Sequence, residues 1–417
     1  MPFHEAGASM TTVDEAIDAG TGHDHWLRIA REIADDLATD AVDREQAGKA
    51  PFDEVARLRE AGLLTLPAPA GHGAGGAGGA DWRTAYAVVR TISAADGAIG
   101  YLLGCHYFLS SSARFFAGPA LATRVEHESA ARQWWWGGGL ASCEPTPRLT
   151  PTARGYVLDG RQSCVTGVGI ADRLVVRATR SGSGDPLAVL VDPAHPGVVY
   201  VDDDTFGQRL AAGGSVEFDS VPVAADDVFG SLSSDEDALP PFAGLAAPTA
   251  RLVSVQFCLG VAEGLLAEVR EYSRVVNSSW QPPAQQPWPG DPSRDPYVLS
   301  VYGELTVAAR SASALADQAV EALARGFAQG EDLDDDECAE IAVLASVAES
   351  AASRAALEIT TRALDVIGAR AAFLRHGFDR FWRNARTHTL REPVADRLRE
   401  VGDYFLNGAH PPFTIPS

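Results

Sequence analysis

Arginine, histidine and aromatic side chains crowd one segment near the C-terminus of this 417-residue chain. Five arginines lie within it, at Arg370, Arg375, Arg380, Arg383 and Arg386. Guanidinium groups bind phosphate and carboxylate oxygens in a fixed fork geometry, so the cluster predicts an anion-binding floor. A histidine at 388 adds a group that can hold or move a proton near neutral pH.

Two helices must frame this segment. A long helix is expected to close at Gly368, which can adopt the positive φ of a helix C-terminus. Pro393 suits the first turn of a helix and disfavours the α conformation at Glu392, so residues 388–392 are expected to form a loop or a frayed end. The last helix then starts near Pro393 and is capped by the Asn-Gly pair at 407–408.

Composition bounds the class of protein. Apolar residues make up 46% and charged residues 22% of the chain, as in globular proteins, and its length predicts two or three domains. The net charge of −22 argues against nucleic acid and anionic membranes as partners. Because neither a membrane span nor a signal peptide is recognisable, a cytoplasmic location is expected. The five cysteines lack CxxC spacing, and no metal-ligand spacing stands out, so no metal site is predicted.

Hydrophobic periodicity divides the first half of the chain. Residues 1–22 have none and are predicted to be a flexible tail. The range 23–133 is predicted to be a helical domain, with amphipathic helices at about 25–37 and 52–62, a helix N-capped by Asp81, and a nearly all-apolar helix over 98–116. Short β-branched runs with turn signals then fill 134–235 and predict an antiparallel sheet or small barrel.

Helical periodicity returns in the second half. The range 236–417 holds three long segments, at about 247–276, 297–328 and 336–367, followed by the short C-terminal helix. Together they predict a four-helix bundle. The order of helices, sheet and bundle makes an α+β fold.

Several sequence motifs resemble one family. They are GYVLDG (155–160), GGSVEFDSVPV (213–223), DPYVLSVYGEL (295–305) and GFDRFWRNARTHTL (377–390). With the order of elements, they resemble the flavin-dependent monooxygenases of the acyl-CoA dehydrogenase fold, in the group D two-component branch that contains the dibenzothiophene monooxygenases. The resemblance covers nearly the whole chain from about residue 24 and implies an N-terminal helical domain, a central antiparallel β domain and a C-terminal four-helix bundle.

The resemblance also implies an activity. Such enzymes take reduced flavin, FMNH2 or FADH2, from a separate NAD(P)H:flavin reductase and react it with O2 to a C4a-hydroperoxide. They then oxidise a nitrogen, a sulfur or an aromatic carbon of a small, often specialised, metabolite. The flavin makes the bonds, while the protein supplies a dry pocket and hydrogen-bond donors. A homotetramer assembled through the bundle is implied as well.

Four residues are expected to be catalytic by this resemblance. Thr166 stands where the family presents a hydroxyl and a backbone N–H to the flavin N5/O4 edge. His106 aligns with a pocket histidine, although a lone histidine on an apolar helix is often a satisfied core group. His388 is placed to contact the flavin or the substrate, or to cap a helix end. Arg391 occupies a position where the family commonly has a catalytic histidine, and arginine cannot exchange a proton near neutral pH.

A second set of residues is expected to bind the cofactor. Contacts to the flavin ring are assigned to Trp136, Gly138, Ser142 and Thr166, and the phosphate to Arg274, Arg370 and Arg386, the second of these reaching across a subunit contact. Trp280 and Asn384 complete the set. Relatives carry an asparagine near Gly138 and an arginine before Trp280, where this chain has Ser278-Ser279, so the choice between FMN and FAD stays open. Solvated surface charge is the alternative interpretation of the arginines.

Two other functions stay open. Glu392 lies near the position of the proton-abstracting glutamate of acyl-CoA dehydrogenases, so it could act as a base for hydride transfer to FAD. Its neighbour Arg391 would lower its pKa and weaken it as a base. The other alternative is a binding protein on the same fold that has lost its flavin site.

Overall fold

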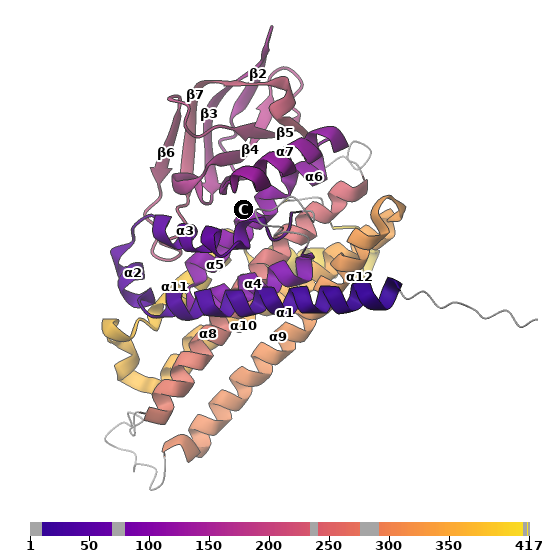
Figure 1. The fold of residues 1–417 in the computed structure, drawn as a ribbon. Coiled ribbons are helices and arrows are strands. Elements are labelled where there is room, and N and C mark those ends of the chain that lie inside the picture. Colours follow the sequence, from indigo (N-terminus) through magenta and orange to yellow (C-terminus); the bar gives the residue numbers. More distant parts are fainter. Residues whose placement is uncertain (1–10, 69–79, 234–240, 276–291, 412–414, 416–417) are drawn as a thin grey trace, which may run out of the picture.

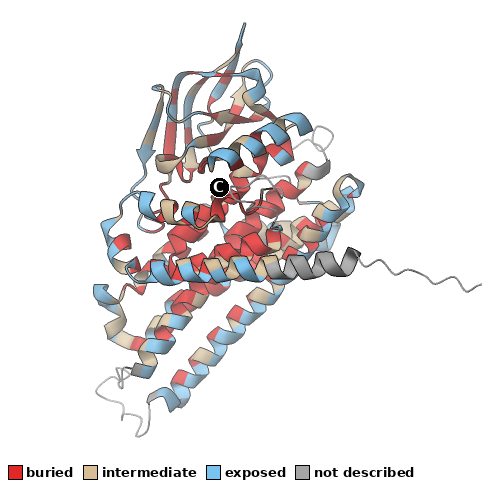
Figure 2. Cartoon of the chain, in the orientation of Figure 1, coloured by how far each residue is buried: buried red, intermediate tan, exposed pale blue. Residues whose placement is uncertain are grey.

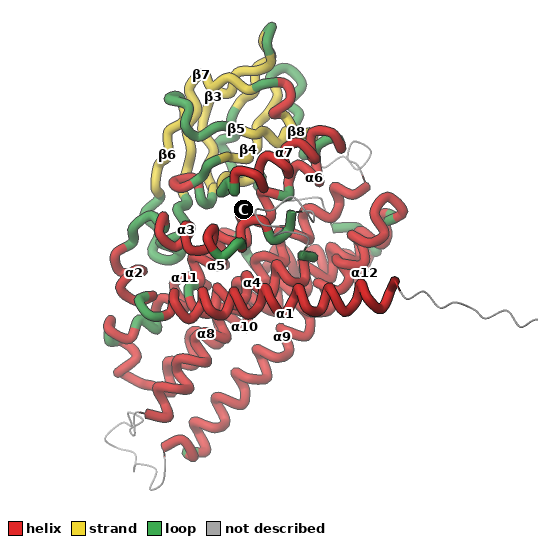
Figure 3. The backbone as a smooth tube through the Cα atoms, in the orientation of Figure 1, coloured by secondary structure: helices red, strands yellow, loops and turns green. Residues whose placement is uncertain are grey.

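The computed structural model describes residues 11–68, 80–233, 241–275, 292–411 and 415 (Figure 1). A β-sheet lies at one end of the molecule and long helices run away from it. The N-terminal helices lie across the junction between these two parts (Figures 1 and 3).

The N-terminal part is helical, as predicted. Its α-helices are α1 (Thr11–Ala38), α2 (Ala41–Ala47), α3 (Phe52–Glu60), α4 (Trp82–Ala95), α5 (Gly97–Ser110), α6 (Ser112–Phe116) and α7 (Pro119–Arg132). The Asp81 carboxylate accepts from the Thr84 N–H at 3.0 Å, which confirms the predicted N-cap. The predicted single helix over 98–116 is wrong, because α5 ends at Ser110 and α6 starts at Ser112. Helix α1 also takes in residues 11–22, which were predicted to belong to a tail.

The central sheet is mixed. Its strands are β1 (Trp136–Gly139), β2 (Arg148–Thr152), β3 (Gly155–Val165), β4 (Arg173–Arg180), β5 (Pro186–Val191), β6 (Val198–Asp202), β7 (Gly214–Val223) and β8 (Val228–Ser231). They lie in the order β6-β7-β3-β2-β4-β5-β8, and β1 pairs with β4. The predicted antiparallel pairing holds for most neighbouring strands, but β4 pairs in parallel with β1 and β2. Periodicity reports which face of a strand is buried and not its direction.

The C-terminal part is a bundle. It contains α8 (Ala246–Val275), α9 (Pro296–Gln329), α10 (Asp335–Ile367), α11 (Asp379–Arg391) and α12 (Val394–Asn407). The first three match the predicted segments closely. Gly368 and Gly408 follow α10 and α12 with φ of 70° and 67°, as expected for helix ends.

The prediction of a loop at 388–392 is wrong. Helix α11 continues through Arg391, and the Glu392 N–H donates to the His388 carbonyl at 3.0 Å. A proline restricts only the residue before it, so the helix needs to break at Glu392 alone. Residues 387–389 are buried, and this burial favours an ordered helix up to Pro393.

Helix α8 lies at the centre of the core, packed against α4, α5, α9 and α10 (Figure 2). It is the one candidate membrane span among the described residues, because its length and composition would suffice to cross a bilayer. However, 78% of its apolar window is buried inside the protein. A central core helix meets the same criterion, so α8 is interpreted as the core of the bundle.

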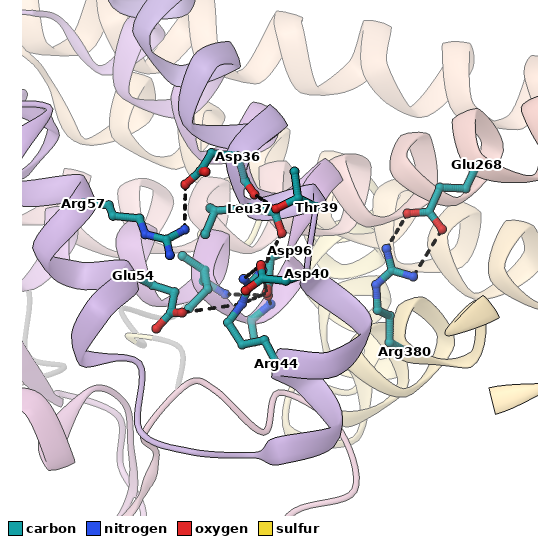
Figure 4. Close-up of polar contacts among 12 residues, drawn as sticks. Asp36, Leu37, Thr39, Asp40, Arg44, Glu54, Arg57, Asp96, Glu268 and Arg380 are labelled. Carbon is teal, nitrogen blue, oxygen red and sulfur yellow. Dashed lines mark hydrogen bonds and ion pairs between the residues drawn. The ribbon is translucent and has the colours of Figure 1, made fainter. Parts of the chain in front are cut away.

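Buried ion pairs fix the two helices that carry the candidate site. The Asp96 carboxylate accepts from the Ala98 and Ile99 N–H groups at the start of α5, and Arg44 of α2 donates to it at 3.0 and 3.2 Å (Figure 4). On the other side, Arg380 of α11 pairs with Glu268 of α8 (Figure 4). The start of α5 and the start of α11 are therefore both anchored to neighbouring helices.

Candidate active site

Gly138 and Thr166 pair where β1 and β3 come together. Each donates its N–H to the other's carbonyl at 2.9 Å. Gly138 has a φ of +120°, and an added Cβ would lie 2.1 Å from the Val175 carbonyl oxygen, so a side chain does not fit there. The Thr166 N–H is engaged inside the sheet, contrary to the expectation that it faces a flavin. The Thr166 hydroxyl is the group of this residue that remains for a contact with the flavin.

A small, mainly apolar pocket lies beside this pair. The helix α8 contributes Ala250, Val253 and Ser254, and β1 and its continuation contribute Gly138 to Leu140. The remaining lining residues come from α5 and from the end of β3: Tyr101, Cys105, Phe108, Leu109 and Thr166. The Cys105 thiol is within hydrogen-bonding reach of the Tyr101 and Thr166 hydroxyls, and burial raises its pKa to about 12, so it stays a neutral thiol.

His388 is buried next to this pocket. Its ring meets Tyr101 and Phe257 edge-on, with centroids 5.3 Å apart in both cases. Nε2 has no hydrogen-bond partner among the described residues. Burial, and secondly the charge of Arg391, lower the pKa of His388 to about 3. An unpartnered buried nitrogen is unfavourable in a finished core, so it marks a place where a ligand would add a partner.

A larger cavity of about 740 Å³ lies between the segment after β1 and helix α12. Ser142 and Cys143 line it from the β domain, Arg391 and Glu392 from the end of α11, and Ile415 from the C-terminal segment. The structure thus brings predicted site residues Ser142 and Arg391 to one cavity.

A network of buried charged residues lies at the wall of this cavity. Arg251 donates to Glu400 at 2.9 Å, and Arg397 pairs with the same carboxylate at 3.0 Å. Glu349 lies deeper, 3.9 Å from Arg397, and neither of its carboxylate oxygens has a hydrogen-bond partner among the described residues. Burial raises the pKa of Glu349 to about 7.

His106 lies apart from both cavities. Its Nε2 is 2.9 Å from the Leu64 carbonyl, and its Nδ1 accepts from the Trp136 N–H at 3.1 Å. The ring stacks on Trp135 at 4.6 Å. Burial lowers the pKa of His106 to about 4. Both ring nitrogens are engaged by backbone, so the geometry favours a core histidine over a catalytic one.

Two predicted cofactor residues have structural partners. The Trp136 indole N–H donates to Ser129 at 2.7 Å, which holds its ring against α7. The side-chain oxygen of Asn384 accepts from the Gln208 N–H at 2.6 Å and so ties α11 to the loop before β7.

The predicted phosphate anchors line neither of the two cavities. Arg274 is exposed at the end of α8 and pairs with Glu271, and Arg370 lies in the 3₁₀ turn after α10. Arg386 contacts Thr389 of its own helix. Trp280 lies outside the described residues.

The predicted anion floor does not form within this chain. Arg380 pairs with Glu268, and Arg383 pairs with Glu45 and Asp379. Arg375 lies over the Phe373 ring at 4.4 Å. The sequence shows that these arginines lie close together along the chain. It does not show that the fold brings carboxylates of other helices, such as Glu268 and Glu45, next to them. Among the described residues, no three His, Cys, Asp or Glu side chains form a group that could hold a metal ion.

Several site residues were missed. Tyr101, Cys105, Phe108 and Leu109 follow one another at the i, i+4, i+7, i+8 spacing of one helix face, which was a usable signal. His106, the residue singled out from this helix, lies on another face. Glu349 could not be recognised from the sequence, because its ion-pair partner Arg397 lies on a helix about 50 residues further along the chain.

Comparison with known proteins identifies relatives over nearly the whole chain. Residues 22–118 match the family "Acyl-CoA dehydrogenase, N-terminal domain", and residues 246–392 match "Acyl-CoA dehydrogenase, C-terminal domain". Dibenzothiophene monooxygenase of Rhodococcus erythropolis is 35% identical over 400 residues, which is 92% of this chain and 94% of the relative. A probable FMNH2-dependent monooxygenase, SfnC of Pseudomonas putida, is 32% identical over 92% of this chain and 95% of its own.

A solved structure is equally similar. The complex of TdsC, a dibenzothiophene monooxygenase from Paenibacillus sp. A11-2, with FMN and indole superposes with a TM-score of 0.85 at 31% identity. The alignment covers 93% of this chain and 99% of that chain. Sequence and structure therefore agree on one set of relatives.

Proposed function

This chain belongs to the flavin-dependent monooxygenases of the acyl-CoA dehydrogenase fold, and we propose that it oxygenates a small aromatic or sulfur-containing compound between α5, β1 and α8, where the pocket of about 40 Å³ has to open to admit the substrate. It uses reduced flavin and O2, as its FMNH2-dependent relatives do. The observation that carries the proposed substrate class is the mainly apolar lining of that pocket next to the Thr166 hydroxyl and His388. Relatives named for dibenzothiophene and bound to indole agree with such a substrate.

The residues present fit a flavin. The cavity of about 740 Å³ has the size of a small-molecule site, and it holds polar side chains at Ser142 and Arg391. Thr166 lines the apolar pocket, and His388, whose Nε2 has no partner among the described residues, contacts Tyr101 of the same pocket. Ser142, Thr166 and Arg391 would hold the flavin ring where the β domain meets the end of α11. Bound there in its reduced form, the flavin would activate O2 and supply the oxygen atom.

The chain's own residues then have distinct tasks. The Thr166 hydroxyl donates a hydrogen bond to the reacting oxygen. His388, kept neutral by burial, contributes Nε2 as a second hydrogen-bonding group beside the same pocket. Phe108, Leu109 and Val253 exclude water, which strengthens these hydrogen bonds. Arg391 holds a permanent positive charge at the cavity wall and stabilises negative charge without moving a proton.

The phosphate is proposed to bind at a subunit contact. None of Arg274, Arg370 and Arg386 lines the two cavities, so a neighbouring copy would supply them, together with Trp280. A homotetramer through the bundle gives such a contact. It also covers the exposed apolar residues of α9 and α12, which include Val307 at 65% and Leu406 at 78% exposure.

The proposed setting is that of a two-component system. A separate NAD(P)H:flavin reductase would deliver the reduced flavin, both proteins would work in the cytoplasm, and the substrate would be a specialised metabolite. Relatives described as FMNH2-dependent support the use of FMN.

A substrate assay tests this proposal. The protein is mixed with photoreduced FMN, O2 and either indole, dibenzothiophene or butyryl-CoA, and products are identified by mass spectrometry. We expect oxygenated product from an aromatic or sulfur compound and none from the acyl-CoA. Reduction of oxidised flavin by butyryl-CoA would instead assign Glu392 the role of a dehydrogenase base.

A further inference from the structure

Two cysteines meet at the edge of the large cavity. Cys143 lies in the segment after β1 and lines the cavity, and Cys164 lies near the end of β3. Their thiols are within hydrogen-bonding reach of each other, and both residues are partly exposed. The pair lies two residues before Thr166 on one side and next to Ser142 on the other, so it adjoins the residues proposed to hold the flavin.

The backbone around the pair is held firmly. The Gln162 side chain donates to the Gly139 carbonyl at 2.7 Å and accepts from the Arg177 N–H at 3.2 Å, which binds the segment after β1 to β3. The pairing of β3 with β7 shifts register between Gln162 and Val165, and Cys164 has a φ of +57°. A bulge of this kind takes a residue out of the regular pleat. It leaves Cys164 beside Cys143.

The surroundings favour thiol chemistry. The hydrogen bond from Cys143 and, more weakly, the charge of Arg391 lower the pKa of Cys164, while partial burial opposes them. The thiolate is the reactive form of cysteine. A nucleophilic thiol with a second thiol in reach and a solvent-connected cavity beside it is the arrangement of a redox-sensitive pair.

We propose that Cys143 and Cys164 form a redox-sensitive dithiol that hydrogen peroxide converts into an intramolecular disulfide. The Cys164 thiolate attacks one peroxide oxygen, the O–O bond breaks, and one water leaves after protonation of the hydroxide. The Cys143 thiol then attacks the sulfenic sulfur, the S–S bond forms and a second water leaves. The two cysteines lose two electrons and the peroxide gains them.

The oxidant has a source at this site. Reduced flavin and O2 yield hydrogen peroxide when no substrate takes the oxygen, so this part of the inference rests on the proposed function. The disulfide would join the Ser142 segment to the end of β3 and stiffen the wall of the flavin cavity. Turnover without substrate would thereby oxidise two cysteines beside the site that produced the hydrogen peroxide.

The disulfide itself is tested without flavin. The full-length protein is treated with hydrogen peroxide, and free thiols are counted under denaturing conditions. We expect two of its five thiols to disappear, the mass to fall by about 2 Da for the two hydrogens lost, and dithiothreitol to restore both. A non-reducing digest should contain one cross-linked species that joins the peptides of Cys143 and Cys164.

Matched variants sharpen the result. Cys338→Ser, which removes a thiol on α10, should keep the cross-link, whereas Cys143→Ser and Cys164→Ser should each abolish it. Five intact thiols after peroxide, a sulfinic acid on Cys164 without a disulfide, or a cross-link between two chains would each overturn the proposal. Because no flavin or substrate is present, these outcomes are independent of the monooxygenase assay.

Discussion

At the scale of single residues, the Thr166 hydroxyl is the side-chain group of the β domain that lies closest to the proposed chemistry. Thr166→Val keeps the volume and removes the hydroxyl, so oxygenation should fall on the order of 10²-fold, as for other lost donors to a reacting oxygen. The measured quantity is the amount of oxygenated product formed per reduced flavin supplied. Thr65→Val is the control, because Thr65 is buried elsewhere and its hydroxyl has no partner among the described residues. Equal losses in both variants would contradict a role for Thr166.

The two buried histidines predict how stability depends on pH. The folded-state pKa values of His388 and His106 lie at about 3 and about 4, below the ordinary value of 6.5, so between these values the unfolded chain binds protons that the folded chain does not. The contribution of these two histidines is therefore complete above pH 6.5 and is lost as the pH falls toward 3, whereas Glu349, with its raised pKa of about 7, contributes in the opposite direction between pH 4.5 and 7. For His388 alone the loss at pH 5 is about 2 kcal/mol.

Urea unfolding at pH 7.5 and pH 5 checks this. His388→Phe should remove part of the loss between the two pH values, whereas His127→Gln, at an exposed position, should leave it unchanged. An equal loss of stability between the two pH values in the wild type and in His388→Phe would contradict a His388 that burial keeps neutral in the folded state.

Single residues were also where sequence reasoning reached its limit. His106 looked like a pocket histidine, because its partners, the Leu64 carbonyl and the Trp136 N–H, come from distant segments. Tyr101 and Cys105 went unnoticed although their spacing places them on one face. The residue type determines which interactions a side chain can make, whereas the fold determines which groups it contacts.

At the scale of elements, helix α5 carries one wall of the substrate pocket, and its start depends on Asp96. This carboxylate is buried and pairs with Arg44, whereas Arg57 and Asp36 form an exposed pair nearby (Figure 4). Arg44→Met leaves the Asp96 charge buried without its cation, which should destabilise the fold by roughly 3–5 kcal/mol. Arg57→Met should lose at most about 1 kcal/mol. Chemical unfolding of both variants measures the difference, and similar losses would contradict the anchoring of α5 by Arg44.

Elements with strong local signals were predictable. The three long helices α8, α9 and α10 appear within a few residues of their predicted bounds, because long apolar periodicity marks all three and a glycine follows both α9 and α10. The end of α11 was not predictable from Pro393, because burial against α5 and α8 decides it. Strand direction in the sheet was likewise invisible, since parallel and antiparallel strands share the same alternation.

At the scale of the whole molecule, the exposed apolar residues of the bundle predict assembly. The native mass by light scattering should be about four times the chain mass of 44.0 kDa. Val307→Glu places a charge on the outer face of α9 and should reduce this mass. Val199→Glu, at an exposed position on β6, should not. If the proposed phosphate contact crosses subunits, Val307→Glu should also weaken FMN binding. A wild-type monomer that binds FMN tightly would contradict the shared site.

The central claim is that reduced flavin, bound where the β domain meets the bundle, delivers one atom of O2 to a substrate in the adjoining pocket. The most direct measurement supplies photoreduced FMN, indole or dibenzothiophene, and ¹⁸O2 to the protein, and follows the label by mass spectrometry. The account predicts one ¹⁸O atom per product molecule, and a large loss of labelled product in Thr166→Val but not in Thr65→Val. Product oxygen that comes from water, or labelled product that forms equally well without the protein, would contradict it.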